Sequence, residues 1–269
     1  MKNTRMIAGA GILLSLFLAG CQSSLVPSSE TPSSETPSSV VTTSTVSTTS
    51  VPPSSEVTSQ TTSEEPIPGV PDLFISEYIE GPSTNKVVEL YNPTGDTVDL
   101  SLYTMKLFTN GRALENPLAS KTLSGTLAAG ETFVFYNFDG TIDTALQTVV
   151  NAIPDARKWK GVYADSGSTL IASFNGDDAL ALFKGEAIID VFGVIGQDPG
   201  DFWSLTFANG GGKTQDVVMT RIPSVDTPSV GSINLGGTDF PNAFDPLEWS
   251  VVTYAAVPAT HTVGTHTID

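Results

Sequence analysis

Short apolar segments separated by turn residues recur along the chain from residue 73 onward. They are five to eight residues long and rich in β-branched and aromatic side chains, with Gly, Pro and Asn between them. Segments of this length and composition predict β-strands joined by tight turns. The strands are expected at residues 73–79, 87–91, 104–109, 132–136, 179–183, 187–194 and 217–222.

The connections between these segments indicate the fold class. Lys184-Gly185-Glu186 joins two predicted strands over three residues, which predicts a β-hairpin. Many short strands joined by tight turns are typical of a sandwich or a barrel. We therefore predict an all-β domain over residues 70–269, and the large aromatic side chains are expected in its core. These are Trp203, Trp249, Phe133, Phe135, Phe174 and Phe192.

One segment has the periodicity of a helix. Ile142, Leu146, Val149, Val150 and Ile153 recur at intervals of three and four residues, and Pro154 follows them. The segment lies in an insertion between strands, over residues 138–167. We expect one short helix that covers an edge or an end of the sandwich.

The first residues have a different pattern. An unbroken apolar run from Met6 to Phe17 follows Lys2 and Arg5, and it is too short to span a hydrocarbon core of roughly 30 Å. Small residues then precede Cys21, which is the pattern that bacterial lipoprotein processing recognises. We predict a lipoprotein signal peptide over residues 1–20 and lipid attachment at Cys21. The alternative is an ordinary signal peptide with an incidental cysteine.

Residues 21–69 consist mainly of Ser, Thr, Pro, Val and Glu. This composition cannot bury enough apolar area to offset the entropy of ordering the chain. We predict a disordered linker that carries the domain away from the membrane, and an exported protein that is lipid-anchored at the cell surface. Because the chain has one cysteine, it cannot form an internal disulfide or a cysteine-based metal cluster.

The charge balance bears on the partners. The chain has 12 basic and 29 acidic residues, and without Lys2 and Arg5 of the signal peptide its net charge is −19. Nucleic-acid affinity comes largely from Lys and Arg side chains that neutralise phosphates. Direct binding to nucleic acid is therefore not expected.

Several motifs, taken in order, resemble a lamin-tail domain. Together they cover residues 73–267, essentially the whole predicted domain. They are Ser76-Glu77-Tyr78-Ile79-Glu80-Gly81, Asn85-Lys86-Val87-Val88-Glu89-Leu90-Tyr91-Asn92, Val98-Asp99-Leu100-Ser101, Phe174-Asn175-Gly176-Asp177-Asp178-Ala179-Leu180, Asp190-Val191-Phe192-Gly193 and Phe244-Asp245-Pro246-Leu247-Glu248-Trp249.

The resemblance implies an immunoglobulin-like β-sandwich of the lamin-tail type. The end of the chain is similar to the way this module closes in secreted bacterial nucleases, where a catalytic domain follows it. Here we expect the module without that nuclease domain. In lamins the same fold is a docking module, which favours binding over catalysis by analogy.

Acidic residues on the early strands and in one turn are candidate calcium ligands. Glu77 and Glu89 lie on two predicted strands, while Asp177 and Asp178 lead into a third. If these strands are neighbours, the four carboxylates could converge on a weak calcium site. The favoured interpretation is a turn bonded to its own backbone and solvated glutamates. No other cofactor is expected.

The one basic cluster is Arg157-Lys158-Trp159-Lys160. It is either a solvated loop, which we favour, or a binding contact in which Trp159 offers an exposed aromatic surface. His261 and His266 are the only histidines, and they are expected in a closing strand or tail with exposed rings.

No set of nucleophile, base and orienting group can be assembled, so we expect no enzyme activity. We predict a membrane-anchored binding module for an unidentified extracellular protein or polymer. The alternative is an accessory of an extracellular nuclease system, which captures DNA or docks a nuclease.

Overall fold

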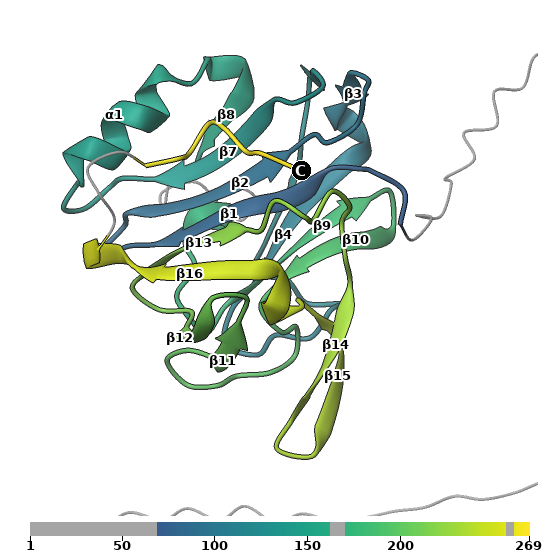
Figure 1. The fold of residues 1–269 in the computed structure, drawn as a ribbon, viewed down its shortest axis with the longest axis vertical. Coiled ribbons are helices and arrows are strands. Elements are labelled where there is room, and N and C mark those ends of the chain that lie inside the picture. Colours follow the sequence, from purple (N-terminus) through teal and green to yellow (C-terminus); the bar gives the residue numbers. More distant parts are fainter. Residues whose placement is uncertain (1–68, 162–169, 257–260) are drawn as a thin grey trace, which may run out of the picture. The chain divides into compact units, whose positions relative to one another are not determined.

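The fold is built on two larger β-sheets (Figure 1). The computed structural model describes residues 69–161, 170–256 and 261–269. The predicted signal peptide, Cys21 and the predicted linker up to residue 68 lie outside the described residues. Among the described helices, none combines the length and the apolar character that a membrane crossing requires.

The larger sheet has six strands. Their order across the sheet is β16 (Trp249–Thr253), β13 (Val217–Arg221), β1 (Phe74–Glu80), β2 (Lys86–Tyr91), β7 (Thr132–Asn137) and β8 (Lys158–Lys160). All neighbouring pairs are antiparallel except β7 and β8, which run parallel.

The second sheet has four antiparallel strands. Their order is β10 (Ala187–Phe192), β9 (Ala179–Lys184), β4 (Tyr103–Phe108) and β5 (Ala119–Thr122). Three two-stranded sheets complete the set: β3 (Val98–Asp99) with β6 (Thr126–Leu127), β11 (Ser204–Phe207) with β12 (Gly210–Lys213), and β14 (Gly231–Leu235) with β15 (Thr238–Ala243). Short 3₁₀ turns lie at η1 (Leu100–Leu102), η2 (Asp155–Arg157), η3 (Leu170–Ala172), η4 (Pro246–Glu248) and η5 (Tyr254–Ala256).

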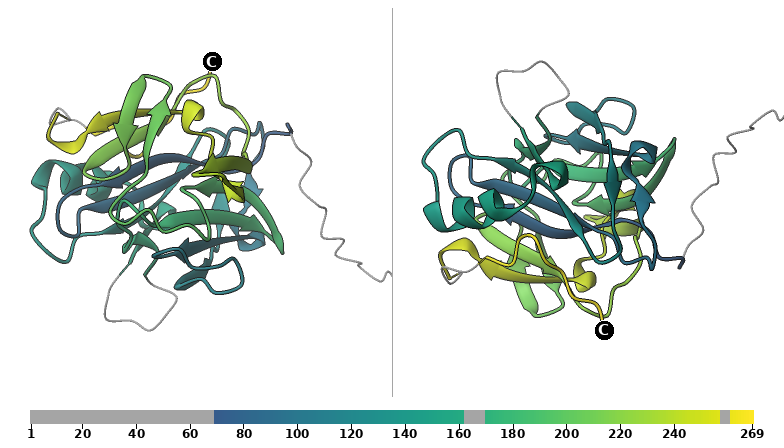
Figure 2. Two further views of the ribbon diagram at one scale, coloured as in Figure 1. Left: turned by 90° about the horizontal axis from the view of Figure 1, so that it is seen from below. Right: turned by 90° about the horizontal axis from the view of Figure 1, so that it is seen from above.

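The main core lies between the two sheets, and Figure 2 shows these layers from two further directions. It contains Tyr78 and Phe135 of the larger sheet together with Leu182 and Phe192 of the smaller one. Every aromatic side chain expected in the core is buried, including Trp203 and Trp249, which are 2% and 0% exposed. All seven predicted strands are present, and the predicted all-β fold with one short helix is confirmed.

A second, smaller core covers the outer face of the six-stranded sheet. Leu146 and Val150 of helix α1 (Thr144–Ala152) pack there against strand residues such as Val87 and Val134. The helix therefore lies on the outer face of this sheet, toward the end where β1 finishes and β2 begins. The helix also starts later than its apolar pattern suggests, because Asp143 caps it by accepting hydrogen bonds from the amides of residues 145 and 146.

The second core on the outer face explains why apolar and polar residues alternate so little along β1 and β2. Every residue of both strands is buried, because one face meets the main core and the other meets the helix and the end of the chain. Strands buried on both faces lose the alternation of apolar and polar positions.

A fully buried ion pair ties the two sheets together. Arg221 of β13 donates from Nη1 to both carboxylate oxygens of Asp190 on β10, at 3.0 Å each. Its Nη2 donates to Glu248 at 2.6 Å. Asp190 also accepts hydrogen bonds from the amides of Ile75 and Ser229. Burial raises the pKa of Asp190, while the charge of Arg221 opposes that rise.

Candidate functional site

The four predicted calcium ligands form two separate pairs. Glu77 and Glu89 lie side by side on β1 and β2, whereas Asp177 and Asp178 lie in the turn that precedes β9. Within the described part of the chain, no three His, Cys, Asp or Glu side chains gather closely enough to hold a metal ion. The four carboxylates therefore do not converge, and calcium binding by either pair stays a prediction.

Glu77 and Glu89 are buried rather than solvated, which corrects the favoured interpretation. They are direct cross-strand partners, and their exposed fractions are 1% and 0%. Glu89 accepts a hydrogen bond from the Ser76 hydroxyl at 2.7 Å. The Oε2 atom of Glu77 is buried and has no hydrogen-bond partner among the described residues.

The last nine residues of the chain cover this pair. We call residues 261–269 the C-terminal strap; in Figure 1 it runs in yellow across the six-stranded sheet near α1. The Thr262 hydroxyl donates to Glu77 at 3.0 Å, and the Gly264 amide donates to Glu89 at 2.6 Å. Val263 joins the outer core. Both carboxylates are therefore held between the sheet and the strap.

The environment favours the protonated form of both carboxyl groups. Burial raises the pKa of Glu89 to about 7, although the hydrogen bonds from Gly264 and Ser76 oppose the rise. Burial, together with the neighbouring charge of Glu89, raises the pKa of Glu77 well above its ordinary value. At neutral pH the pair therefore retains a proton, as two adjacent carboxylates do when water is excluded.

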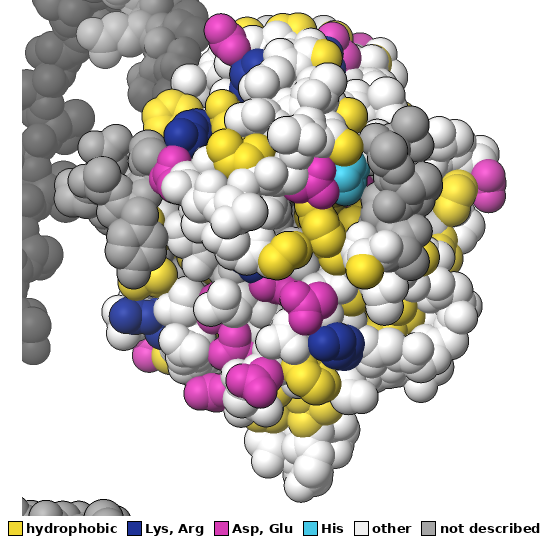
Figure 3. Space-filling model, turned by 90° about the vertical axis from the view of Figure 1, so that its left-hand side faces the viewer, with side chains coloured by type: hydrophobic (Ala, Val, Ile, Leu, Met, Phe, Trp, Pro, Cys, Tyr) yellow, Lys and Arg dark blue, Asp and Glu magenta, His cyan; other side chains and the backbone are white. Residues whose placement is uncertain are grey.

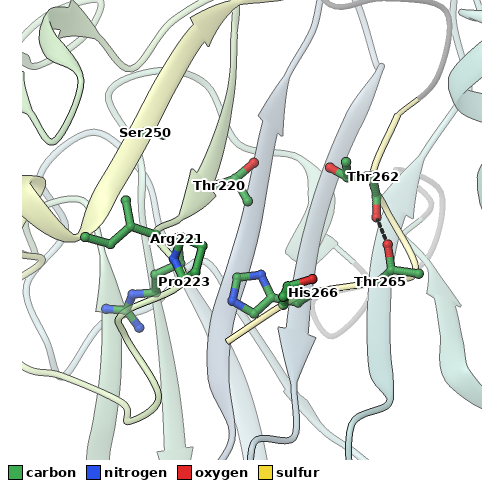
Figure 4. Close-up of a pocket in the computed structure, with 9 residues that line it drawn as sticks. Thr220, Arg221, Pro223, Ser250, Thr262, Thr265 and His266 are labelled. Atoms are coloured by element: carbon green, nitrogen blue, oxygen red, sulfur yellow. Dashed lines mark hydrogen bonds between the residues drawn. The ribbon is translucent and has the colours of Figure 1, made fainter. Parts of the chain in front are cut away.

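A cavity of about 250 Å³ lies beside the strap (Figure 4). Threonines 220, 262 and 265 line it with Arg221 and His266, and the Thr265 hydroxyl donates to the carbonyl of Thr262 at 2.9 Å. The His266 ring packs edge-on against Phe74 and Tyr91, with centroids 5.5 and 5.0 Å away. Burial and the nearby charge of Arg221 lower the pKa of His266 to about 4.

The two histidines lie in a tail, as predicted, but their rings are not exposed. His266 is half-buried under aromatic contacts, and Nε2 of His261 lies 3.9 Å from Asp143. Burial lowers the pKa of His261, and the charge of Asp143 opposes that shift. Both rings therefore help to seat the strap.

Asp177 and Asp178 organise the loop that follows β4. The Asn110 side-chain amide donates to Asp177 at 3.0 Å, and the Asn110 backbone amide donates to Asp178 at 3.0 Å. Asp178 also accepts from the backbone amide of Asn175. Burial raises the pKa of Asp178 to about 7, although the hydrogen bonds from the two backbone amides oppose this rise. The expected turn, bonded to its own backbone, is present here.

The basic cluster is not a solvated loop. Its residues form η2 and the edge strand β8, which pairs with β7. Lys158 donates to the carbonyl of Ile153 at 2.6 Å and pairs with Asp155 at 3.2 Å, so it caps the end of α1. Arg157 pairs with Glu131 at 3.7 Å and Lys160 with Asp139 at 2.8 Å.

Trp159 is half-buried and packs against the main core instead of offering an exposed ring. Nζ of Lys121 lies 3.6 Å from the centre of its ring. The indole N–H is buried without a hydrogen-bond partner among the described residues.

Most of the cations in the described residues are engaged by carboxylates. Within the described residues, seven of the ten Lys and Arg side chains form ion pairs with carboxylates. Figure 3 shows one face of the molecule, on which Lys and Arg side chains are scattered singly among Asp and Glu. A polyanion would have to compete with these carboxylates for each cation.

Sequence reasoning missed Lys121 and Asn110 as parts of these arrangements. Both stand alone between uncharged neighbours, and each meets its partners only through strand pairing or a loop contact. Arg221 is the last residue of β13, and nothing in the local sequence indicates its partner Asp190 on β10.

The two packed sheets and the antiparallel pairing define an all-β, immunoglobulin-like sandwich. Residues 67–196 match the family model described as Lamin Tail Domain. The predicted resemblance to a lamin tail domain is therefore confirmed over residues 67–196. No curated protein and no solved structure matches the chain.

The match ends at residue 196, yet the sheet continues beyond it. Strands β13 and β16 complete the six-stranded sheet next to β1. The lamin tail domain is a non-catalytic fold of the immunoglobulin type, which is consistent with a binding module.

Proposed function

We propose that this protein is an exported lipoprotein that presents its lamin tail domain, as a non-catalytic binding module, to an extracellular partner. The observation that carries the proposal is the family match over residues 67–196, directly after a predicted lipid anchor and linker. Two acyl chains at Cys21 would hold the chain in the membrane, and the linker would let the domain reach outward.

The absence of catalysis is part of this proposal. In the described residues both histidines are occupied in seating the strap, with His266 against aromatic rings and His261 beside Asp143. A general base needs an open approach to a substrate proton. The proposed activity is therefore recognition alone.

The anchor is tested by labelling cells that express the full chain with a radioactive fatty acid and by separating their membranes. We expect label in the wild-type chain, recovery in the membrane fraction and digestion by protease added outside the cell. Cys21→Ala should lose the label, while Ser23→Ala, two residues away, should keep it. An unlabelled wild-type chain in the cytosol, with residues 1–20 intact, contradicts the proposal.

The alternative, capture of DNA for an extracellular nuclease, is tested by a gel-shift titration of the full chain at low salt. Since most cations are paired with carboxylates, we expect no shift at concentrations of about tens of micromolar. Binding in that range, weakened by added salt, would favour DNA capture instead.

A further inference from the structure

The side of the sandwich where both sheets end, at β5 and β8, contains a cavity of about 470 Å³. Its lining comes from Lys121 and the turn after β5, from Phe133 of β7 and from the η2–β8 segment with Trp159. Pockets for small organic ligands typically measure roughly 300–1,000 Å³. The cavity therefore has the size of a ligand site.

The floor of the cavity is apolar and continuous with the main core. Phe133 and Leu123 are 5% and 3% exposed, and both belong to the core cluster. Trp159 packs against the same cluster. An apolar group that entered the cavity would meet the same surface that the sandwich uses for its own packing.

Two residues of the lining, Lys121 and Trp159, carry hydrogen-bond donors whose acceptor is not found among the described residues. The Trp159 indole N–H is buried without a partner among the described residues, which is costly in a folded protein. The Lys121 ammonium group lies over the Trp159 ring and forms no ion pair with any described carboxylate. Both groups are donors, so an acceptor would satisfy either of them, and the charge of the half-buried Lys121 favours an anionic one.

The other charged groups of the lining are already satisfied. Lys158 donates to the end of α1 and pairs with Asp155, whose side chain is almost fully exposed to solvent. Lys121 is therefore the cation of this cavity that remains available for a ligand.

We propose that this cavity binds a carboxylate that carries an aromatic or branched apolar group. The apolar group packs on Phe133 and Leu123, and the carboxylate pairs with the Lys121 ammonium group above the Trp159 ring. This inference rests on the proposed binding function and gives it a ligand class.

The probe is N-acetyl-phenylalanine, and its neutral amide is the matched control ligand. The chain has three tryptophans, of which Trp203 and Trp249 are 2% and 0% exposed, so a change in emission reports mainly on Trp159. We expect a saturable change in the fluorescence of the full chain in lipid nanodiscs with the acid. The amide should bind at least about tenfold more weakly, because it lacks the charge that Lys121 pairs with.

Lys121→Met should weaken the binding of the acid by a similar factor and leave the binding of the amide unchanged. Lys106→Met is the matched variant, since Lys106 also lies over an aromatic ring, 3.8 Å from the centre of Phe183, but lines a different surface. It should leave binding of the acid unchanged. Circular dichroism of both variants checks that the fold is retained.

Equal binding of acid and amide would overturn the proposal, and so would an unchanged affinity in Lys121→Met. No saturable response at about 10 mM acid would overturn it as well. A chain that is lipid-anchored at Cys21 but does not respond to the acid refutes this ligand site and leaves the proposed anchored module standing.

Discussion

The free energy of unfolding should fall as pH rises, and replacing Glu89 by Gln should remove much of this fall. The glutamine has the shape of the protonated acid: its oxygen can accept from the Gly264 amide, and its NH₂ can donate to the Ser76 hydroxyl. The variant therefore keeps the contacts with the strap while it removes the ionisable group.

The magnitude follows from the pKa of Glu89. It is about 7 in the folded protein, whereas the ordinary value is 4.5. Between these values the folded state keeps a proton that the unfolded state has released, so stability falls as pH rises, and the fall is complete above pH 7. At about 1.4 kcal/mol per pH unit, the wild-type chain should lose about 3 kcal/mol between pH 5 and pH 8 through this group.

Other groups titrate over the same range and must be separated from Glu89. Burial also raises the pKa of Asp178 to about 7, so this group acts in the same direction. His266 acts in the opposite direction, because its pKa is lowered to about 4 and stability is lost as pH falls. Both groups are present in wild type and variant, so the difference between the two chains isolates the Glu77–Glu89 pair.

The assay is urea unfolding at several pH values from 5 to 8, followed by tryptophan fluorescence. We expect Glu89→Gln to match the wild type at pH 5 and to be more stable by about 3 kcal/mol at pH 8. The exposed Glu186, in the turn between β9 and β10, supplies the control: Glu186→Gln should change stability equally at every pH. If the curves of Glu89→Gln and wild type ran parallel, the pair would not share a proton under the strap.

Two further changes test the buried contacts. Arg221→Met leaves the Asp190 carboxylate buried without its cation, so the free energy of unfolding measured by calorimetry should fall by about 3–5 kcal/mol. Adding Asp190→Leu to this variant should restore more than half of the loss. A loss as small as that of an exposed ion pair would contradict this expectation. Gly264→Ala should speed hydrogen exchange over residues 261–269, because Gly264 has φ +99° and an added Cβ would lie 3.3 Å from Ile153. The control is Gly196→Ala, which is also at positive φ but has open space around it and should leave this exchange unchanged. Equal exchange in both variants would show that the strap is not seated by this contact.

The strand pattern was sufficient to predict the fold class, but not the smaller elements. Strand β12 contains three glycines in four residues, and β8 consists of one tryptophan between two lysines. Neither has apolar alternation, because each is held by backbone pairing with a neighbour that the local sequence does not reveal. The solvated loop predicted for residues 157–160 is what local composition alone indicates.

The burial of the glutamate pair could not be predicted for a related reason. The pairing of β1 and β2 shifts by one residue between Ile75 and Glu77, and a shift of this kind changes which side chains share a face. The early strands could be predicted from their residues, but the bulge that sets Glu77 opposite Glu89 has no distinct sequence signal.

The unusual pKa of Glu89 comes from segments far away in the sequence. Its own strand neighbours place it on the outer face of a sheet, where a carboxylate would ordinarily be solvated. Helix α1, about 60 residues later, and the strap, near residue 264, help to remove water from that face. The proton on the pair therefore reports whether the strap is seated: lifting the strap would let water reach both carboxylates, lower their pKa values and release the proton. Because the two events are linked, any partner that displaces the strap should bind more tightly as pH rises through 7.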